Sequence, residues 1–475
     1  MTQDRPRAPV VPARRADRDG RPRVDYRAIW ILAGPLIANS AVQAVLNLTD
    51  TWFIGRLSTA ATAAMASIYW LVLAAVLLLG GVGMAVQTVA AQAYGAGRRA
   101  RAAQAAWSGL AASLLTIPLF ALLGLAGNPI LSWARLDPAV QALALSYWWP
   151  RLVVGGPLAL LVWSLTSFFN GAGRTRITLI VTIVMSVSNA IFNQWFMFGL
   201  GMGMPGSAWG TVAAEVLGLV VALGYFLGPG FATSFRSRLT WRRLELRRQF
   251  ALGLPMGLTS TGDMVGLAIF QLMLVNVGTA AGAATQIVIM LSSLCYMPGY
   301  GIALSGTTLV GQAIGAGDRA WAEKVGQAVI GLVVAYMGGA GLVLALATPA
   351  LAPLFVRAGD PNALAVLALI TPLMWIAAGY QIFDGLNLGS GFCLRGAGDV
   401  RVPALLVAGL AWLGWIPLTQ SLTFARGQGF IPGLPQFGFG AVGAWVAALV
   451  YVVALGLALY ARWRSGAWRR VRLGL

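Results

Sequence analysis

The segment Gln92-Ala93-Tyr94-Gly95-Ala96-Gly97 recurs as Gln312-Ala313-Ile314-Gly315-Ala316-Gly317, 220 positions later in the chain. The following matches occur in the same order in both halves: Pro35 with Pro255 (offset 220), Asn170–Arg176 with Arg395–Arg401 (offset 225), and Ser207-Ala208-Trp209 with Gly443-Ala444-Trp445 (offset 236). Self-similarity in the same order, at an offset that grows only from 220 to 236, indicates a chain built from two related halves.

The composition places both halves in a membrane. Of the 475 residues, 58% are hydrophobic and only 10% are charged, and the mean hydropathy is +0.76. Apolar runs long enough to cross a bilayer are predicted at 28–54, 60–94, 103–127, 138–170, 176–199, 206–228, 250–277, 281–314, 322–348, 361–394, 402–424 and 438–461. The predicted fold is therefore an all-α integral membrane protein with twelve transmembrane helices.

Each half holds six of these spans, and six is an even number. Both halves therefore enter the bilayer in the same sense and are related by an axis along the membrane normal, as parallel repeats. We expect a basic tail at 1–27, an N-terminal lobe at 28–228, a linker at 229–249 and a C-terminal lobe at 250–475 that ends in a second basic tail. The two six-helix lobes should face one another across a central cavity.

The net charge of +19 is distributed unevenly over the loops. When the loops are assigned to alternating sides, one side holds 28 of the 33 Lys and Arg residues, whereas the other holds only Arg56, Arg135, Arg357 and Arg426. The positive-inside rule then predicts a multi-pass protein of the plasma (inner) membrane with both termini in the cytoplasm. The N-terminal tail should bind anionic lipid or stay solvated. A nucleic-acid partner is not expected, because the charge follows the membrane topology.

Short glycine segments mark the cytoplasmic ends of several predicted spans. We interpret each Gly-Ala-Gly as a turn that ends a helix, with arginines beside it as anchors. The predicted linker carries Arg236, Arg238, Arg242, Arg243, Arg247 and Arg248, and should tether the lobes on the cytoplasmic side while they move.

The chain contains no histidine and only two cysteines, Cys295 and Cys393, both in apolar runs. A His-ligated metal, a His general base and a disulfide framework are therefore excluded. Four acidic residues fall inside predicted spans and away from the first two positions of any span: Asp50, Glu215, Asp263 and Asp384. Because a carboxylate at the centre of a bilayer costs about 2.5–3.5 kcal/mol, each one needs water, a partner or a proton.

In the C-terminal lobe, Asp263 and Asp384 should lie at a similar depth in the membrane. Two carboxylates in one low-dielectric pocket cannot both stay ionised without a cation, so one proton or one Na⁺ would satisfy them. Tyr380 precedes Asp384 by one helical turn and could add its hydroxyl to the site. The alternative is structural: each aspartate would accept a hydrogen bond from a nearby hydroxyl, such as those of Thr259 and Thr261.

In the N-terminal lobe, Asp50 should share a polar pocket with the uncharged oxygens of Asn189, Asn193 and Thr211. Arg151 is the single basic residue deep inside a predicted span, more than five residues from either end. An ion pair between Arg151 and Asp50 would keep the carboxylate ionised and limit its use as a proton carrier. For Glu215, pairing with Arg151, exposure to solvent and a chemical role all remain open.

These motifs together resemble the multidrug and toxic compound extrusion (MATE) family over residues 28–461. The segments that carry the resemblance are Asn47-Leu48-Thr49-Asp50 with Gly55, the two Gln-Ala-x-Gly-Ala-Gly segments, Asn170-Gly-Ala-Gly-Arg-Thr175, Asn189-x3-Asn193, Gln381-Ile-Phe-Asp384 and Leu394-Arg-Gly-Ala-Gly-Asp399. The resemblance implies two pseudosymmetric lobes, a V-shaped cavity, and efflux of organic cations in exchange for Na⁺ or H⁺.

The resemblance also implies roles for individual residues. Asp50 matches the family's N-lobe aspartate, while Asp384, Tyr380 and Asp263 match the cation site of the NorM-type branch, which usually has glutamate at the last position. The DinF-type branch carries aspartate where this chain has Asn193. The pattern Tyr147-x3-Arg151-x5-Pro157 nevertheless looks DinF-like, so the features of the two branches are mixed.

The sequence thus predicts a secondary active multidrug antiporter, not an enzyme, with no cofactor. It should act as a monomer in contact with membrane lipid, and its substrates should be amphipathic organic cations held by carboxylates and by the faces of some of the 18 Trp, 19 Phe and 11 Tyr residues. One alternative is a flippase for lipid-linked precursors, which would need a cavity lined by arginines. The other is an intramembrane transferase, which would need an acidic metal cluster or a long loop outside the membrane.

Overall fold

The computed structural model describes residues 8–17, 19–133, 137–235, 243–356, 363–471 and 473. Arg135, Arg357 and the linker arginines Arg236, Arg238 and Arg242 lie outside these residues. The described chain is almost entirely helical and contains twelve helices that are long and apolar enough to cross a membrane, which confirms the predicted fold class.

The first six spans follow the predicted order. They comprise α1 Tyr26–Gly55, α2 Thr59–Gly95, α3 Arg99–Leu114 with α4 Ile117–Leu125, α6 Pro138–Trp149 with the π-helical η1 Pro150–Gly155 and α7 Gly156–Gly171, α8 Thr175–Asn193 with the π-helical η2 Gln194–Gly199, and α9 Met204–Leu227. The short helices α5 Gly127–Trp133 and α10 Pro229–Phe235 lie between and after them.

The second six spans repeat this pattern. They comprise α11 Arg243–Val277, α12 Thr279–Gly315, α13 Arg319–Leu351 with the 3₁₀ turn η3 Ala352–Phe355, α14 Ala363–Ala397, α15 Arg401–Gly409 with the π-helical η4 Leu410–Trp415 and α16 Ile416–Thr423, and α17 Gly440–Arg464 followed by the 3₁₀ turn η5 Ala467–Arg470. The seventh span begins at Arg243 rather than at 250, so the end of the predicted linker belongs to α11.

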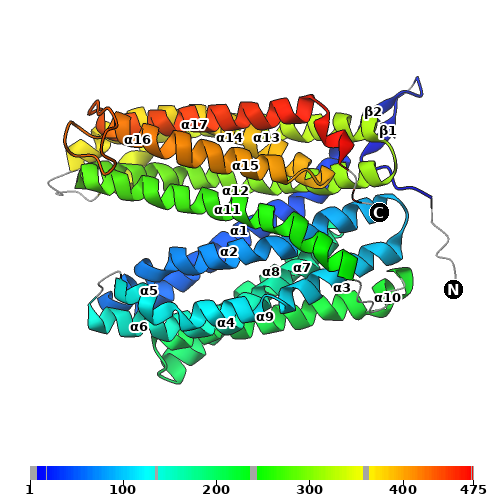
Figure 1. Ribbon diagram of the computed structural model, residues 1–475, viewed down its shortest axis with the longest axis horizontal. Coiled ribbons are helices and arrows are strands. Elements are labelled where there is room, and N and C mark those ends of the chain that lie inside the picture. Colours follow the sequence, from blue (N-terminus) through cyan, green and yellow to red (C-terminus); the bar gives the residue numbers. More distant parts are fainter. Residues whose placement is uncertain are drawn as a thin grey trace.

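The helices form two bundles that meet at one end of the molecule and diverge toward the other (Figure 1). Helices α1 to α9 form the N-lobe, and helices α11 to α17 form the C-lobe. The first and last described residues of the chain lie at the end where the bundles meet, which we call the termini side (Figure 1). Pro35 and Pro255, the matched prolines, lie inside α1 and α11 respectively.

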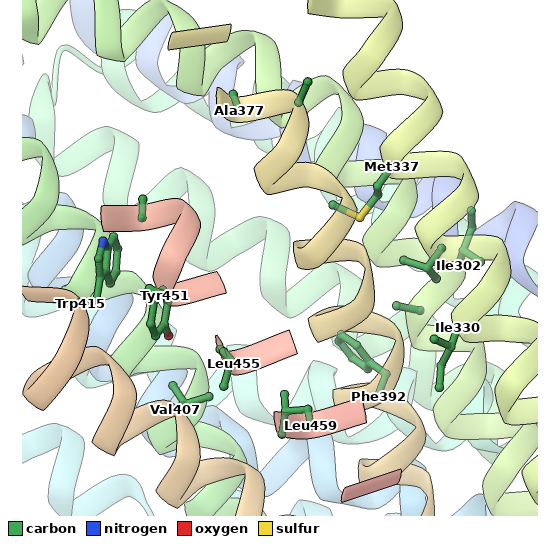
Figure 2. Packing of buried hydrophobic residues seen from close by; sticks show 14 of the residues in the cluster. Ile302, Ile330, Met337, Ala377, Phe392, Val407, Trp415, Tyr451, Leu455 and Leu459 are labelled. Carbon is green, nitrogen blue, oxygen red and sulfur yellow. The ribbon is translucent and has the colours of Figure 1, made fainter. Parts of the chain in front are cut away.

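Each lobe has its own packed interior. The largest cluster of buried apolar side chains belongs mainly to the C-lobe, where Ile302 of α12 lies close to Ile330 and Met337 of α13 (Figure 2). On the other side of that lobe, Trp415 and Tyr451 stack with their ring centroids 4.8 Å apart (Figure 2). Two further clusters fill the N-lobe.

The repeated glycine segments bring the two lobes into direct contact. A Cβ atom on Gly95 would lie 2.0 Å from the backbone oxygen of Gln312, and one on Gly315 would lie 1.9 Å from the backbone oxygen of Gln92. Contacts this short require residues without a side chain, so the glycines let α2 and α12 cross backbone against backbone. Gln92 and Gly95 of the first repeat therefore contact Gly315 and Gln312 of the second, which occupy the equivalent positions.

Four hydrogen bonds fasten this crossing, and they too form pseudosymmetric pairs. We call them the interlobe latch: Gln92 Nε2 to the Gly396 carbonyl (2.9 Å), Gln312 Nε2 to the Gly171 carbonyl (2.9 Å), Thr88 Oγ1 to the Arg395 carbonyl (2.9 Å) and Thr308 Oγ1 to the Asn170 carbonyl (2.9 Å). The predicted turns are present as well, because Gly97, Gly173, Gly317 and Gly398 all have positive φ. Interpreting the repeats as turns and anchors alone was incomplete.

The N-terminal tail contacts this region, although most of its described residues are exposed. Its described part forms an antiparallel pair of short strands, β1 Arg14–Ala16 and β2 Pro22–Val24. The Val10 amide donates to the Gly95 carbonyl of the N-lobe at 3.0 Å, and the Trp321 indole of the C-lobe donates to the Pro12 carbonyl at 2.8 Å. The described tail therefore contacts both lobes beside the latch, and lipid binding by its exposed arginines stays a prediction.

Candidate transport site

The N-lobe contains the polar pocket predicted around Asp50. Asn193 donates to Asp50 Oδ1 at 2.6 Å and to Asn189 Oδ1 at 3.2 Å, and Asn189 in turn donates to Thr211 Oγ1 at 3.1 Å. The chain of bonds thus joins α1 to α8 and α9. A Cβ atom on Gly210 would lie 2.3 Å from Asn193 Oδ1, so the glycine makes room for this arrangement.

Asp50 lines a cavity of about 250 Å³ within this lobe. The Tyr147, Arg151 and Glu215 side chains line the same cavity, which brings the DinF-like pattern next to the aspartate. Arg151 lies in the π-helical segment η1, and π-helical turns are often found at functional sites.

Arg151 forms an ion pair with Glu215 and not with Asp50. Its Nη1 atom lies 2.8 Å from Glu215 Oε1, and Glu215 is only 4% exposed. Gly155 provides the space, since a Cβ atom there would lie 2.6 Å from Arg151 Nη1. Of the three possibilities for Glu215, the structure shows pairing with Arg151, and Asp50 is left with an amide partner but without a bonded cation among the described residues.

The C-lobe brings the second predicted pair of carboxylates into one region. Asp384 of α14 is 5% exposed and accepts a hydrogen bond from Asn387 at 3.1 Å. Asp263 of α11 is exposed and lines a small cavity of about 40 Å³ together with Asn387. The two carboxylates interact electrostatically, and Tyr380 lies within electrostatic range of both.

The structural alternative for Asp263 does not fit the hydroxyl groups beside it. Thr259 donates to the Pro255 carbonyl at 2.9 Å, and Thr261 donates to the Ala74 carbonyl at 3.2 Å. Each threonine has one hydroxyl hydrogen, and each directs it to the backbone. Neither hydroxyl therefore stabilises the carboxylate.

Three residues of this region were not predicted from the sequence. Asn387 follows Asp384 by three positions, so helical spacing could have identified it. The Tyr451 hydroxyl lies near Asp263 but makes no regular hydrogen bond among the described residues, and it comes from α17, far along the chain. Arg395 directly follows the predicted span 361–394, and its side chain lines the Asp263 cavity.

A further cavity of about 330 Å³ lies between the lobes, and its lining includes the latch residues Thr88, Asn170 and Arg395. It is lined by α1, α2, α7 and α8 of the N-lobe and by α11, α12 and α14 of the C-lobe. Gln43, Trp163 and Met185 line both this interlobe cavity and the Asp50 cavity, so the two spaces adjoin. The expected central cavity is therefore present, with an extension into the N-lobe.

Comparison with known families agrees with this architecture. The MatE family model matches residues 35–195 and again residues 255–418, which together make up more than half of the chain. The chain belongs to the MatE family. The two matches begin at Pro35 and Pro255, the prolines that mark the internal repeat. The chain is thus a member of a family of transporters.

Curated proteins match most of the chain. A protein of Rhizobium meliloti called "Probable multidrug resistance protein NorM" is 28% identical, with 92% of each chain covered. A protein of Burkholderia mallei with the same name is 31% identical, with 84% of this chain and 86% of the other covered.

Solved structures share the fold at lower identity. A MATE transporter in a bent conformation superposes with a TM-score of 0.81 at 17% identity, covering 94% of this chain and 96% of the other. An outward-facing multidrug resistance MATE transporter of the MOP superfamily gives a TM-score of 0.80 at 17% identity, with 93% and 96% covered. A MOP superfamily transporter from Pyrococcus furiosus gives 0.79 at 16%, also with 93% and 96% covered.

Proposed function

We propose that this MatE protein is a secondary active multidrug efflux antiporter. It exports amphipathic organic cations in exchange for Na⁺ or H⁺ by alternating access of a central site to the two sides of the membrane. Relatives that match more than four-fifths of the chain are called multidrug resistance proteins, which supports this assignment.

The observation that carries the proposal is the state of Asp50. Its carboxylate lines a cavity inside the N-lobe, and its bonded partner among the described residues is the neutral amide of Asn193. A carboxylate within a membrane protein is costly unless a positive charge or a proton satisfies it. An organic cation, Na⁺ or H⁺ that enters the cavity would supply that charge.

The C-lobe carboxylates offer a second place for the coupling ion. Asp263, Asp384 and Tyr380 supply oxygen atoms, the ligand type that hard cations prefer. Asn387 and Tyr451 add an amide and a hydroxyl to the same region. A single proton or Na⁺ would relieve the repulsion between the two aspartates.

The positions of the latch and the termini suggest how transport proceeds. We place the termini side in the cytoplasm, because the positively charged loops lie there. The latched arrangement is then closed to the cytoplasm, and inward opening requires the latch to separate. A cation that binds more tightly to the latched state than to the inward-open state, or the reverse, shifts the population toward the state it prefers. The size of the shift is set by the difference between its two affinities.

The setting of the protein follows from the same reasoning. We place it in the plasma (inner) membrane as a monomer surrounded by lipid, working without a cofactor. We assign a structural role to the Arg151–Glu215 ion pair, which joins η1 to α9. Removing either partner would leave the other charge buried without compensation.

The test is dye transport by purified protein in liposomes. An imposed Na⁺ gradient and an imposed proton gradient are applied separately, and a cationic rhodamine ester serves as substrate. Asp50→Asn removes the N-lobe charge, and Asp384→Asn removes one charge of the C-lobe pair. We expect each substitution to lower gradient-driven transport by at least about tenfold, because a hydrogen bond or contact to a charged group contributes roughly 1.5–3 kcal/mol.

The matched control is Asp137→Asn. Asp137 is exposed and caps the N-terminus of α6 through a bond to the Ala139 amide, a role that asparagine fills equally well. This variant should transport like the original protein. If neither gradient drives the dye, or if Asp50→Asn and Asp384→Asn both transport normally, the proposed mechanism is wrong.

A further inference from the structure

The interlobe cavity is lined by a positive charge, whereas a site for organic cations is expected to carry negative charge. Among the described residues that line it, Arg395 is the single charged one, and the carboxylates Asp50 and Glu215 line the adjoining N-lobe cavity instead. Its walls otherwise combine aromatic rings, thioethers and neutral amides and hydroxyls. The expectation that carboxylates line the central cavity therefore holds only for its N-lobe extension.

The Arg395 side chain is held at the cavity wall by its surroundings. Its guanidinium carbon lies 4.7 Å from the ring centroid of Phe392, which is also a lining residue. Within the described chain, Arg395 makes no ion pair within 4.0 Å, although it interacts electrostatically with Asp263 on its other side. Arginine presents a planar set of N–H donors that matches a carboxylate or a phosphate.

A second polar group of this cavity lacks a partner. Asn39 of α1 lines the cavity, and its Oδ1 atom is buried without a hydrogen bond among the described residues. Such an acceptor requires an N–H or O–H donor, because leaving it unsatisfied costs free energy. The cavity thus offers an anion partner from the C-lobe and an acceptor from the N-lobe.

The size and walls of the cavity suit an aromatic compound. Its volume of about 330 Å³ lies within the range of small-molecule sites. Trp163, Tyr296 and Tyr300 provide aromatic faces, while Met84 and Met297 provide flexible apolar contacts that adapt to different shapes.

We propose that the interlobe cavity binds amphipathic aromatic compounds that carry an anionic oxygen group, and that Arg395 is the residue that binds this group. The inference deepens the proposed efflux function and rests on it. A compound with both charges would place its anionic end at Arg395, while its cationic end reaches the adjoining Asp50 cavity. The anionic group is the carboxylate of the compound or the phosphate of a lipid headgroup, two sources with the same recognition chemistry.

The test compares two forms of one rhodamine dye that differ only at the carboxyl group. The free acid is zwitterionic, and its methyl ester is cationic. Binding of each to purified protein is followed by fluorescence anisotropy, for the original protein, Arg395→Gln and Arg395→Lys. We expect Arg395→Gln to weaken binding of the acid by about tenfold relative to the ester, and Arg395→Lys to restore part of the loss because it keeps the charge.

The matched control is Arg56→Gln. Arg56 also lies over an aromatic ring, that of Trp52 at 4.9 Å, but it caps the end of α1 and does not line the cavity. This variant removes the same charge and should leave the acid-to-ester ratio unchanged. Equal weakening by Arg56→Gln would show that net charge, not a site, governs binding, and would overturn the proposal.

A second arm distinguishes the two sources of the anion. Soluble short-chain phosphatidylglycerol is titrated against the same proteins in neutral detergent. Arg395-dependent binding of the acid assigns the site to a carboxylated compound, and Arg395-dependent binding of the lipid alone assigns it to a headgroup. If neither ligand distinguishes the original protein from Arg395→Gln, the anion site does not exist, whatever the outcome of ester transport in the gradient assay.

Discussion

A single added methyl group at Gly315 should prevent the termini side from closing. In Gly315→Ala the Cβ atom would lie 1.9 Å from the Gln92 backbone oxygen and 2.7 Å from its carbonyl carbon. Both neighbours are backbone atoms of α2, so no side-chain rotation can relieve the clash. The helices must separate instead, and the latch spans that crossing.

The magnitude follows from the distances. Contacts under 3.0 Å essentially do not occur for real Cβ atoms, so α2 and α12 must move apart by about 1 Å. The two glutamine bonds, now 2.9 Å long, would stretch to roughly 4 Å, beyond hydrogen-bonding range. Their loss costs about 1 kcal/mol each, and overpacking adds about 1–3 kcal/mol. A total near 4 kcal/mol would shift the ratio of closed to open molecules by roughly a thousandfold.

Pulsed electron paramagnetic resonance can measure this shift. Spin labels at Arg176→Cys in the N-lobe and Lys324→Cys in the C-lobe occupy exposed positions on the two lobes, near the N-terminal ends of α8 and α13. The native Cys295 and Cys393 are buried and are replaced in the background. We expect Gly315→Ala to move the distance distribution toward longer values in lipid bilayers.

The control is Gly331→Ala, which adds the same methyl group to a helical glycine of α13 with nothing within 4 Å. It should leave the distribution unchanged and slightly favour the helix. A folded Gly315→Ala protein whose label distances match those of the background would refute the reasoning, because the latch would then tolerate a side chain at its tightest point.

Three further predictions concern the rest of the molecule. Glu215→Gln should lower the free energy of unfolding by about 3–5 kcal/mol, since it leaves the Arg151 charge without its ion-pair partner. The double variant Arg151→Met with Glu215→Gln should recover part of that loss in a melting assay. Gly210→Ala should reduce dye transport, because its Cβ would displace the Asn193 amide that bonds the N-lobe aspartate; normal transport would separate that bond from function. Deleting residues 1–24 should increase labelling of a cysteine introduced at Ala96 by a membrane-impermeant thiol reagent, since the tail bonds to the neighbouring Gly95 carbonyl and to the other lobe.

The twelve spans and their two-fold repetition were predictable because both are properties of local sequence. Membrane helices satisfy their backbone hydrogen bonds internally, so hydropathy and length identify them without knowledge of their neighbours. The boundaries were less accurate where polar residues continue a helix beyond the apolar run. Helix α11 begins at Arg243, within a segment that its arginines had marked as a linker.

The sequence predicted which residues make up the candidate site, but not which of them form ion pairs. Charged residues inside apolar spans are rare enough to indicate Asp50, Asp263 and Asp384 directly. The sequence left Arg151 free to pair with either Asp50 or Glu215, and the turn geometry of η1 with the space at Gly155 decided for Glu215. Both features depend on how η1 packs against α9.

The order of amino acids alone thus determined how many times the chain crosses the membrane, that its halves are related, and which acidic groups are out of place in lipid. Only the tertiary structure decided that the repeated glycines join the lobes, that the described tail fastens both of them, and that Arg395 faces a cavity. The physical reason is one of range. Hydropathy acts along a single helix, whereas a close crossing or a cavity wall exists only once residues hundreds of positions apart have been brought together.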